Sequence, residues 1–401
     1  MSLSFRSAVA KGASALRAGL FGLGLLSAAP AVAQTTFQTI APYVILVDAE
    51  TRSVLFEKSA DELMAPASTA KLMTAEIVFH EIAEGRLKLE DEFTVSEHAW
   101  REGGTRSGGS SMFAALGSKI SINDLLHGLI IQSGNDAAIV LAEGIAGSED
   151  AFATLMSRRA RDLGMAKSTF ANPWGKADPA QMVTAREMAL LAGHIIRSYP
   201  ERYKIFGEKD FTWNKIKQQN RNPLLFMDIG ADGLKTGDIK DSGFGLVGSA
   251  VQNGQRLIVV LNGLKTAKDR AEEARKLLQW GFRSFDSRTV FKEGETIGTA
   301  RLYGGARSDV PLVADGAVKL LLPRGSGERL SGKIVYQGPI ATPVAKGVEL
   351  ARLKIWRGSV EALDIPLKAG ESVETGSLPR RALDAGLELG AELIRKNFGK
   401  K

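Results

Sequence analysis

The sequence has 401 residues, 44% hydrophobic and 24% charged, which is typical of globular protein with room for two or three domains and excludes a disordered or collagen-like chain. Basic residues exceed acidic ones by seven, but the excess is concentrated in residues 1–33 and 379–401, and the nearly neutral body lacks the clustered cations of a nucleic-acid-binding surface. The absence of cysteine excludes disulfides, thiolate catalysis and cysteine-ligated zinc.

The first 33 residues have the three zones of a secretory signal peptide. A basic stretch ending at Arg17 is followed by an apolar run over residues 18–26 and by Ala31-Val-Ala33, a cleavage site of small residues. The apolar run is far shorter than the roughly 20 residues of a membrane-spanning helix, so a permanent N-terminal anchor is the weaker alternative. We predict that residues 1–33 are removed and that the mature chain begins near Gln34, outside the cytoplasm.

Residues 37–285 show strand patterns at both ends of a helical middle. A hairpin is predicted at the start, and the Asn253-Gly254 pair predicts a second hairpin near the end. This order is typical of an α+β fold in which an antiparallel sheet is flanked by helices. The expected strands are 43–47, 53–56, 245–251 and 256–262, and the expected helices follow Ser68 and lie near residues 125–130, 152–163 and 271–282.

Beyond residue 287 the sequence changes to short alternating or apolar runs separated by glycine and proline. We interpret residues 288–375 as a separate all-β domain without a convincing catalytic group.

Residues 379–401 are predicted to form an amphipathic helix. Leu383, Leu387 and Ile394 recur at helical spacing, and lysines gather at the end of the segment. Because the segment is terminal, moderately basic and preceded by a loop-like stretch, we favour its association with the inner-membrane surface. The alternative is a helix packed on its own protein.

A serine and a lysine lie three residues apart in Ser68-Thr-Ala-Lys71, where the first strand pair gives way to a helix. One helical turn puts the two side chains next to each other, and the Ser68 N–H lies at the positive end of the helix, where it can stabilise an oxyanion. A lysine acts as a base when burial or a neighbouring cation keeps it neutral. Ser-x-x-Lys alone is weak, since it is expected about once by chance in a chain of this length.

Two further motifs supply other parts of an acyl-transfer site. Ser133-Gly-Asn135 lies between two helical segments, where a short turn can direct a hydroxyl and an amide into a cleft, although a helix N-cap is the simpler reading. Lys235-Thr-Gly237 stands where the strands return, and its simpler reading is an exposed turn. Ser121-Ile-Asn123 also fits Ser-x-Asn but is interpreted as the cap of the following helix.

Ser-x-x-Lys, Ser-x-Asn and Lys-Thr-Gly in this order are the signature of penicillin-binding proteins and active-site serine β-lactamases. Within that superfamily the chain resembles the low-molecular-mass, serine-type D-alanyl-D-alanine carboxypeptidases over nearly its whole length. The resemblance implies their penicillin-binding-protein-like fold, with the β-rich second domain and the membrane-associating tail. It is carried by Gly109-Ser-Ser-Met-Phe113, Gln132-Ser-Gly-Asn-Asp-Ala-Ala138, Asn220-Arg-Asn222, Asp232-Gly-Leu-Lys-Thr-Gly237 and Leu278-Gln-Trp-Gly-Phe282.

The resemblance implies that Ser68 attacks the penultimate D-alanine carbonyl of a peptidoglycan stem peptide, that the terminal D-alanine leaves, and that water hydrolyses the acyl-enzyme. Lys71 would be the general base, Ser133 would relay a proton to the leaving amine, and Asn135 would hold Lys71 and the substrate amide. β-Lactams would acylate the same serine. The site would need no metal or cofactor, and the enzyme would lie in the periplasm, peripheral to the outer face of the cytoplasmic membrane.

The resemblance also implies a site for the terminal carboxylate on the third motif. Lys235 and Thr236 would bind it, with Gly237 beside them, and the N–H groups of Ser68 and Asp238 would hold the oxyanion. Arg221 and Arg270 match family positions near the carboxylate.

The chain departs from the family at three points. Ser-Thr-Ala-Lys replaces the usual Ser-x-Thr-Lys, Asp238-Ile239 follows the third motif where a serine or threonine often stands second, and Trp174 replaces a common histidine. These departures concern rate and substrate preference rather than the class of reaction.

Four alternatives remain. A β-lactamase would need a deacylating glutamate between the second and third motifs, and only Glu187 is loosely suitable. A D,D-endopeptidase or transpeptidase would use the same residues, and a non-catalytic wall-binding protein would keep the cleft without turnover. A zinc peptidase would need clustered ligands, whereas the four histidines are scattered singly at His80, His98, His127 and His194.

Overall fold

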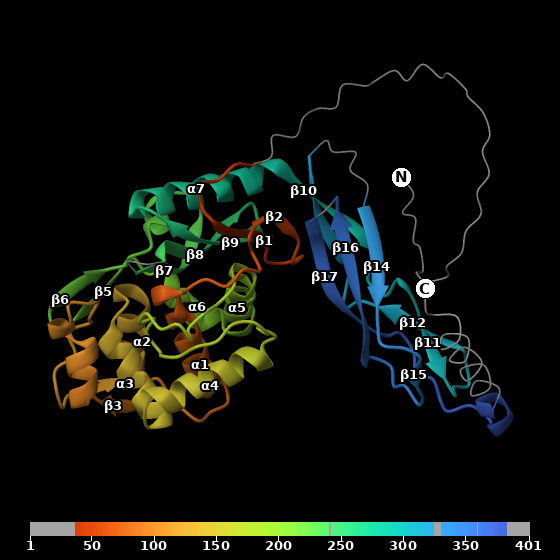
Figure 1. The fold of residues 1–401 in the computed structure, drawn as a ribbon, viewed down its shortest axis with the longest axis horizontal. Coiled ribbons are helices and arrows are strands. Elements are labelled where there is room, and N and C mark those ends of the chain that lie inside the picture. The colour runs from red at the N-terminus through yellow and green to blue at the C-terminus, as the bar shows by residue number, and fades with distance from the viewer. Residues whose placement is uncertain (1–36, 240–241, 325–329, 359, 383–401) are drawn as a thin grey trace, which may run out of the picture. The chain divides into compact units, whose positions relative to one another are not determined.

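The computed structural model describes residues 37–239, 242–324, 330–358 and 360–382, which divide into two compact units (Figure 1). The first unit comprises Thr39–Asp286 with Leu321–Arg324, and the second contains the remaining described residues from Ser287 onward. The predicted signal peptide and most of the predicted tail helix lie outside the described residues, although residues 378–382 are helical. No helix within the described ranges is both long and apolar enough to cross a membrane.

The centre of the first unit is an antiparallel sheet with the strand order β2-β1-β9-β8-β7. The predicted hairpins at both ends of the unit are confirmed, and Asn253 and Gly254 form the second turn with the positive φ angles of 51° and 78° that such a turn requires. Among the described strands, β7 pairs only with β8, and it also contacts the short helices η1 (Ala67–Ala70) and η5 (Lys204–Gly207). The strands are β1 (Tyr43–Asp48), β2 (Val54–Lys58), β7 (Ala231–Ile239), β8 (Gly243–Gln252) and β9 (Gln255–Leu264).

Helices α7 and α5 cover opposite faces of this sheet (Figure 1). In α7, Gly281 lies so close to Leu46 and Leu257 that a Cβ at this position would stand 2.8 and 2.7 Å from their side chains. In α5, Gly193 approaches Ile258, the neighbour of Leu257 in β9. Because successive side chains of a strand point to opposite faces, these contacts place the two helices on either side of the sheet.

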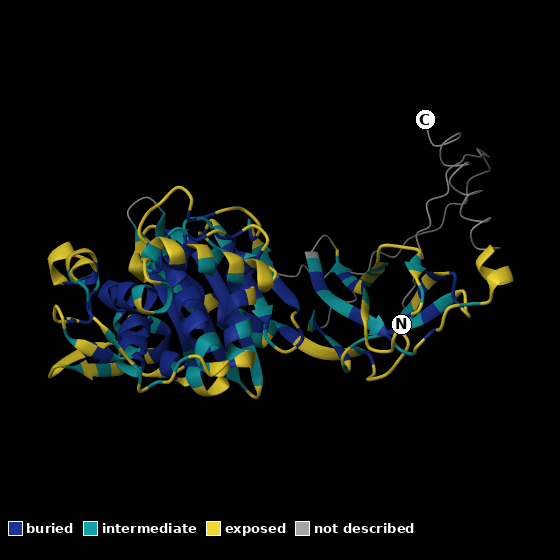
Figure 2. Cartoon of the chain, turned by 90° about the horizontal axis from the view of Figure 1, so that it is seen from below, coloured by how far each residue is buried: buried dark blue, intermediate teal, exposed yellow. Residues whose placement is uncertain are grey.

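The remaining helices bury the segment that carries Ser68 and Lys71. Figure 2 shows dark blue, buried residues concentrated in the sheet and in the helices packed on it. In α1, the fully buried Glu76 accepts hydrogen bonds from Arg159 of α4 and pairs with His194 of α5, which ties three helices together. The helices are α1 (Lys71–Ala83), α2 (Ile122–His127), α3 (Asn135–Ala146), α4 (Glu149–Asp162), α5 (Ala185–Ser198), α6 (Pro200–Tyr203) and α7 (Ala267–Ser284).

Short elements that the sequence did not predict complete the first unit. They include two small hairpins, and the 3-10 helix η1 and the π-helix η4 replace regular helix next to Ser68 and Ser133. The hairpins are β3 (Glu92–Thr94) with β4 (Lys119–Ser121) and β5 (Asp210–Trp213) with β6 (Ile216–Gln219). The short helices are η1 (Ala67–Ala70), η2 (Ala99–Gly103), η3 (Thr105–Ser107), η4 (Gly128–Gln132), η5 (Lys204–Gly207) and η6 (Pro223–Phe226).

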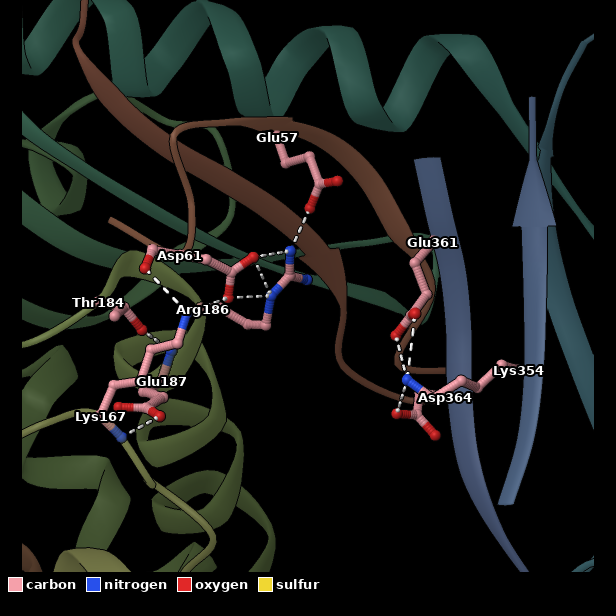
Figure 3. Close-up of polar contacts among 9 residues, drawn as sticks. All are labelled: Glu57, Asp61, Lys167, Thr184, Arg186, Glu187, Lys354, Glu361 and Asp364. Carbon is pink, nitrogen blue, oxygen red and sulfur yellow. Dashed lines mark hydrogen bonds and ion pairs between the residues drawn. The ribbon is translucent and has the colours of Figure 1, made fainter. Parts of the chain in front are cut away.

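Apart from the short helical stretch at residues 378–382, the described part of the second unit is built from strands, as predicted. The larger sheet has the order β14-β16-β17-β12-β11-β15, and β10 pairs with β13. On β16, Lys354 bridges Glu361 and Asp364 of β17, with Nζ–O distances of 3.2 and 3.0 Å (Figure 3). The α+β prediction with a C-terminal all-β part is therefore confirmed. The strands are β10 (Phe285–Phe291), β11 (Gly298–Tyr303), β12 (Asp309–Val313), β13 (Val318–Pro323), β14 (Leu330–Val335), β15 (Ile340–Ala341), β16 (Glu349–Arg357) and β17 (Val360–Ala369).

Candidate active site

Ser68 and Lys71 meet as the sequence predicts. The Lys71 Nζ lies 3.0 Å from the Ser68 Oγ, because η1 runs directly into α1 and brings residues three apart onto one side. The hydroxyl that departs from the family pattern has a local role, since Thr69 Oγ1 donates to the carbonyl of Pro66 over 2.6 Å. Gly237 of β7 passes close to this turn, and a Cβ there would stand 3.1 Å from the Ser68 nitrogen. A glycine thus keeps the space beside the Ser68 N–H open.

Lys71 is buried, with 1% of its surface exposed, and three oxygens surround its amine. These are the Ser68 Oγ, the Asn135 Oδ1 at 2.8 Å and the Trp174 carbonyl at 2.6 Å. Burial, and then the positive charges of Lys235 and Arg221, lower the pKa of Lys71 well below the usual value for lysine. A neutral amine has two N–H donors and one lone pair. It can therefore donate to Asn135 and Trp174 and accept the Ser68 proton.

A tight turn over residues 172–176 places the Trp174 carbonyl on Lys71. Asn172 Oδ1 accepts from the N–H groups of Gly175 and Lys176 at 2.8 and 2.9 Å, and Thr74 of α1 donates to the Pro173 carbonyl over 2.6 Å. Sequence reasoning missed this contact because a backbone atom makes it. The Asx-type spacing between Asn172 and Gly175 is the signal that could have indicated the turn.

The Trp174 side chain, which departs from the family pattern, has its own anchor. Its Nε1 donates to Glu149 at the start of α4 over 2.9 Å, and the other Glu149 oxygen lies 2.7 Å from His98 Nε2. The indole thus connects the turn next to Lys71 to two side chains of the helical part.

Ser133 lies at the break between η4 and α3, and Asn135 just beyond it reaches the site. Ser133 is buried and left-handed, with φ at 65°, and Gly134 occupies the N-cap without a side-chain bond. Asn135 opens α3, as the N-cap alternative expected, but no side chain of the motif caps the helix, and the Asn135 amide is directed to Lys71 instead. The Ser121 cap is confirmed, since its side chain accepts from the Asp124 N–H.

The buried carboxylate of Asp136 fixes the loop opposite this break, and the sequence analysis did not single it out. It accepts hydrogen bonds from the Ser111 Oγ at 2.6 Å, the Met112 N–H at 2.9 Å and the Ala114 N–H at 3.1 Å. The loop and the start of α3, which carries Asn135, are thereby held together.

The third motif contributes the buried Lys235 on β7, and Arg270 of α7 lies near it. Burial, followed by the charges of Arg221 and Arg270, lowers the pKa of Lys235 to about 7. Arg270 of α7 is 8% exposed, and its Nε finds no hydrogen-bond acceptor among the described residues. The Lys235 Nζ donates to the Thr236 carbonyl over 3.1 Å. Two buried cations, one of which has a nitrogen without a described acceptor, suit an anionic ligand such as a carboxylate. Asp238 is exposed, and its negative charge raises the pKa values of Lys71 and Lys235. This effect is smaller than the lowering by burial and neighbouring cations, so both pKa values remain lowered.

Two cavities adjoin residues of the site. A cavity of about 1000 Å³ is lined by Asp238 and Ile239 together with Ala177 and Pro179, which follow the Trp174 turn. A second cavity of about 460 Å³ is lined by Gln132 and Arg221.

The comparisons with known proteins agree with this geometry. A family model described as D-alanyl-D-alanine carboxypeptidase matches residues 29–266, and one described as the C-terminal domain of penicillin-binding protein 5 matches residues 285–375. The chain is 40% identical to the D-alanyl-D-alanine carboxypeptidase DacC of Escherichia coli (strain K12), covering 85% of this chain and 86% of the relative. The chain belongs to the D-alanyl-D-alanine carboxypeptidase family.

Solved structures of other family members support the same assignment. Penicillin-binding protein 5 of Haemophilus influenzae superposes with a TM-score of 0.71 at 35% identity, covering 85% of this chain and 99% of that protein. Penicillin-binding protein D2 of Listeria monocytogenes, solved in an ampicillin-bound form, has a TM-score of 0.54 at 27% identity and covers 62% of this chain and all of that one.

Glu187 lies in a structural contact. Its carboxylate accepts from the Lys167 N–H at 2.9 Å, and its own N–H donates to the capping hydroxyl of Thr184 (Figure 3). The carboxylate also accepts from the Ser168 N–H at 2.7 Å. Neighbouring Arg186 pairs with Glu57 and Asp61. With its carboxylate occupied in this way, Glu187 is not placed to activate a deacylating water, which argues against the β-lactamase alternative.

Proposed function

We propose that this family member removes the terminal D-alanine from peptidoglycan stem peptides by acyl transfer to Ser68. The observation that carries the proposal is the buried Lys71 amine, with its lowered pKa, within 3.0 Å of the Ser68 Oγ. A base of this kind activates a serine without a histidine. The buried cations of Lys235 and Arg270 supply a place for the terminal carboxylate that defines a carboxypeptidase substrate.

Acylation follows from the contacts of Lys71. Neutral Lys71 takes the Ser68 proton while the Oγ attacks the penultimate D-alanine carbonyl, and the N–H groups of Ser68 and Asp238 stabilise the oxyanion. The C–N bond then breaks as Ser133 passes a proton to the leaving amine. Asn135 holds the substrate amide together with Lys71. Water cleaves the Ser68 ester, and the proton returns to the serine.

The substrate carboxylate binds to Lys235 and Thr236 next to Gly237, with Arg221 and Arg270 near it. β-Lactams carry a carboxylate and an amide carbonyl in a similar arrangement, so they acylate the same serine; the ampicillin-bound relative supports this. With Glu187 engaged elsewhere, deacylation of the penicilloyl-enzyme is expected to be slow.

The pH profile tests the assignment of the two lysines. The kcat/KM for a peptide ending in D-alanyl-D-alanine should rise as Lys71 loses its proton, well below the usual pKa of lysine, and fall as Lys235 loses its charge near a pKa of about 7. In Lys235→Arg the alkaline fall should disappear, because a guanidinium keeps its proton. If Lys235→Arg kept the fall in kcat/KM at the same pH, deprotonation of Lys235 would not be its cause.

The direct test of the proposed reaction is release of D-alanine from a peptide with a D-alanyl-D-alanine end. The wild type should release one D-alanine per peptide, and Ser68→Ala should release none. Release of a larger fragment, or none from folded wild-type enzyme, would overturn the proposal.

We also propose the domain organisation and location. Residues 1–33 would be a cleaved signal peptide, 37–285 the peptidase domain, 288–375 the β-rich domain, and 379–401 a helix that holds the enzyme on the outer face of the inner membrane. Deleting 379–401 should move the enzyme from the membrane fraction to the periplasmic fraction. If the distribution between the two fractions were unchanged, residues 379–401 would not be what holds the enzyme on the membrane.

A further inference from the structure

We propose that the cavity beside Gln132 and Arg221 binds the side chain of the leaving amino acid, so that the enzyme cleaves D-alanyl bonds to D-residues with longer polar or anionic side chains as well as to D-alanine. This inference rests on the proposed function, because it names the substrates of the same Ser68 reaction.

The cavity lies on the leaving-group side of the site. Gln132, in its lining, directly precedes Ser133, the group beside the leaving amine. Arg221, also in the lining, is near enough to lower the pKa values of both Lys71 and Lys235. The larger cavity, by contrast, contains Asp238 and Ile239, which follow the third motif. An extended substrate along β7 would therefore place its acyl part toward Asp238 and its leaving residue toward Gln132.

The cavity is larger than D-alanine requires. Its volume is about 460 Å³, within the range of ligand-binding pockets, whereas a terminal D-alanine offers only a methyl group. Phe113 and Ile216 on its rim are exposed, so the cavity is open to solvent and a side chain of several atoms can enter without displacing protein.

The lining has the chemistry of a polar, anion-tolerant subsite. Among the described residues that form it, carboxamides and cations predominate and no carboxylate occurs. Lys217 already pairs with Asp210 at 3.1 Å. Arg221, which the proposed function also places near the terminal carboxylate, is the lining cation that no described carboxylate pairs. The Gln218 Nε2 donates to the Met112 carbonyl, but its Oε1 has no donor among the described residues. The Gln218 Oε1 is buried, so a side-chain amide or carboxylate of the leaving residue would meet the exposed Arg221 guanidinium and Gln219 carboxamide here.

The cavity is preformed. Phe113 has a positive φ of 68°, a strained conformation for an aromatic residue, and its N–H is held by the Ser111 Oγ at 2.9 Å. Ser111 is in turn bonded to the buried Asp136. Strand β6 also lines the cavity, and its register is fixed by four residue pairs with β5. A preformed pocket binds without the cost of ordering its walls.

The test compares four peptides with one acyl part and D-alanine, D-glutamine, D-glutamate or D-lysine as the terminal residue. The wild-type kcat/KM for the D-glutamine and D-glutamate peptides should lie within about tenfold of that for D-alanine, with D-lysine lower because of Arg221. Gln219→Trp, an exposed position in the lining, should lower the values for D-glutamine and D-glutamate by at least about tenfold and leave D-alanine unchanged. Thr212→Trp, exposed on β5 outside the cavity, is the matched control.

Two results would overturn the subsite. One is a wild-type kcat/KM for the D-glutamine and D-glutamate peptides more than about a hundredfold below that for the D-alanine peptide. The other is an equal effect of Gln219→Trp and Thr212→Trp on the kcat/KM values for these peptides. Failure of the D-alanine peptide itself in folded wild-type enzyme would refute the proposed function instead. The two failures are thereby distinguished.

Discussion

Replacing Lys71 by methionine should slow acylation of Ser68 by about a thousandfold, the middle of the range for loss of a general base. Methionine has a similar length and fills the same buried space, so the change removes the amine that contacts Ser68, Asn135 and the Trp174 carbonyl while largely preserving the packing. The measurement is the rate of adduct formation with a fluorescent penicillin. Lys276→Met, at an exposed position of α7, is the control and should acylate at the wild-type rate.

Lys71→Arg tests whether Lys71 acts as a base or only as a positive charge. A guanidinium stays protonated at any pH that the fold tolerates and cannot accept the Ser68 proton, so this variant should be as slow as Lys71→Met. Wild-type acylation in Lys71→Arg, or a loss below about tenfold in Lys71→Met, would mean that another group is the base.

Asp136→Ala should lower the free energy of unfolding by about 3 kcal/mol, because it leaves several buried donors of the 111–114 loop without an acceptor. It should also slow acylation, since Asp136 is the residue next to Asn135 and holds the start of α3. Urea unfolding and penicillin labelling measure the two effects.

Asp162→Ala, exposed at the end of α4, controls for loss of an acidic residue and should change the free energy of unfolding by no more than about 0.5 kcal/mol. An Asp136→Ala protein with wild-type stability and labelling would show that the loop is held by other contacts.

The sequence was sufficient to predict the elements with strong local signals. Asn253-Gly254 predicted its hairpin because only a few residue types adopt two successive left-handed conformations. Ser68 and Lys71 were placed together because a single helical turn fixes their spacing. The convergence of the three motifs came from the family resemblance rather than from any local pattern, since Lys71, Asn135 and Lys235 are far apart in the chain.

Other parts of the site depend on tertiary contacts that no local pattern encodes. The Trp174 carbonyl is a backbone group, so its contact with Lys71 is independent of the side chain at that position. Glu187 carried the right chemical group for a β-lactamase base, but the Lys167 and Ser168 amides that occupy it come from a separate loop. The cavity beside Gln132 needs the unpredicted β5–β6 hairpin as one wall.

The most direct test of the Ser68 mechanism is a time course of intact mass for residues 34–401 mixed with benzylpenicillin, with Ser68→Ala in parallel. We predict a mass increase of one penicillin per chain that persists after the free drug is removed and that is absent from Ser68→Ala. No adduct on the wild type, or an adduct that survives in Ser68→Ala, would contradict the acyl-enzyme mechanism. An adduct that disappears within seconds while the drug is consumed would instead identify a β-lactamase.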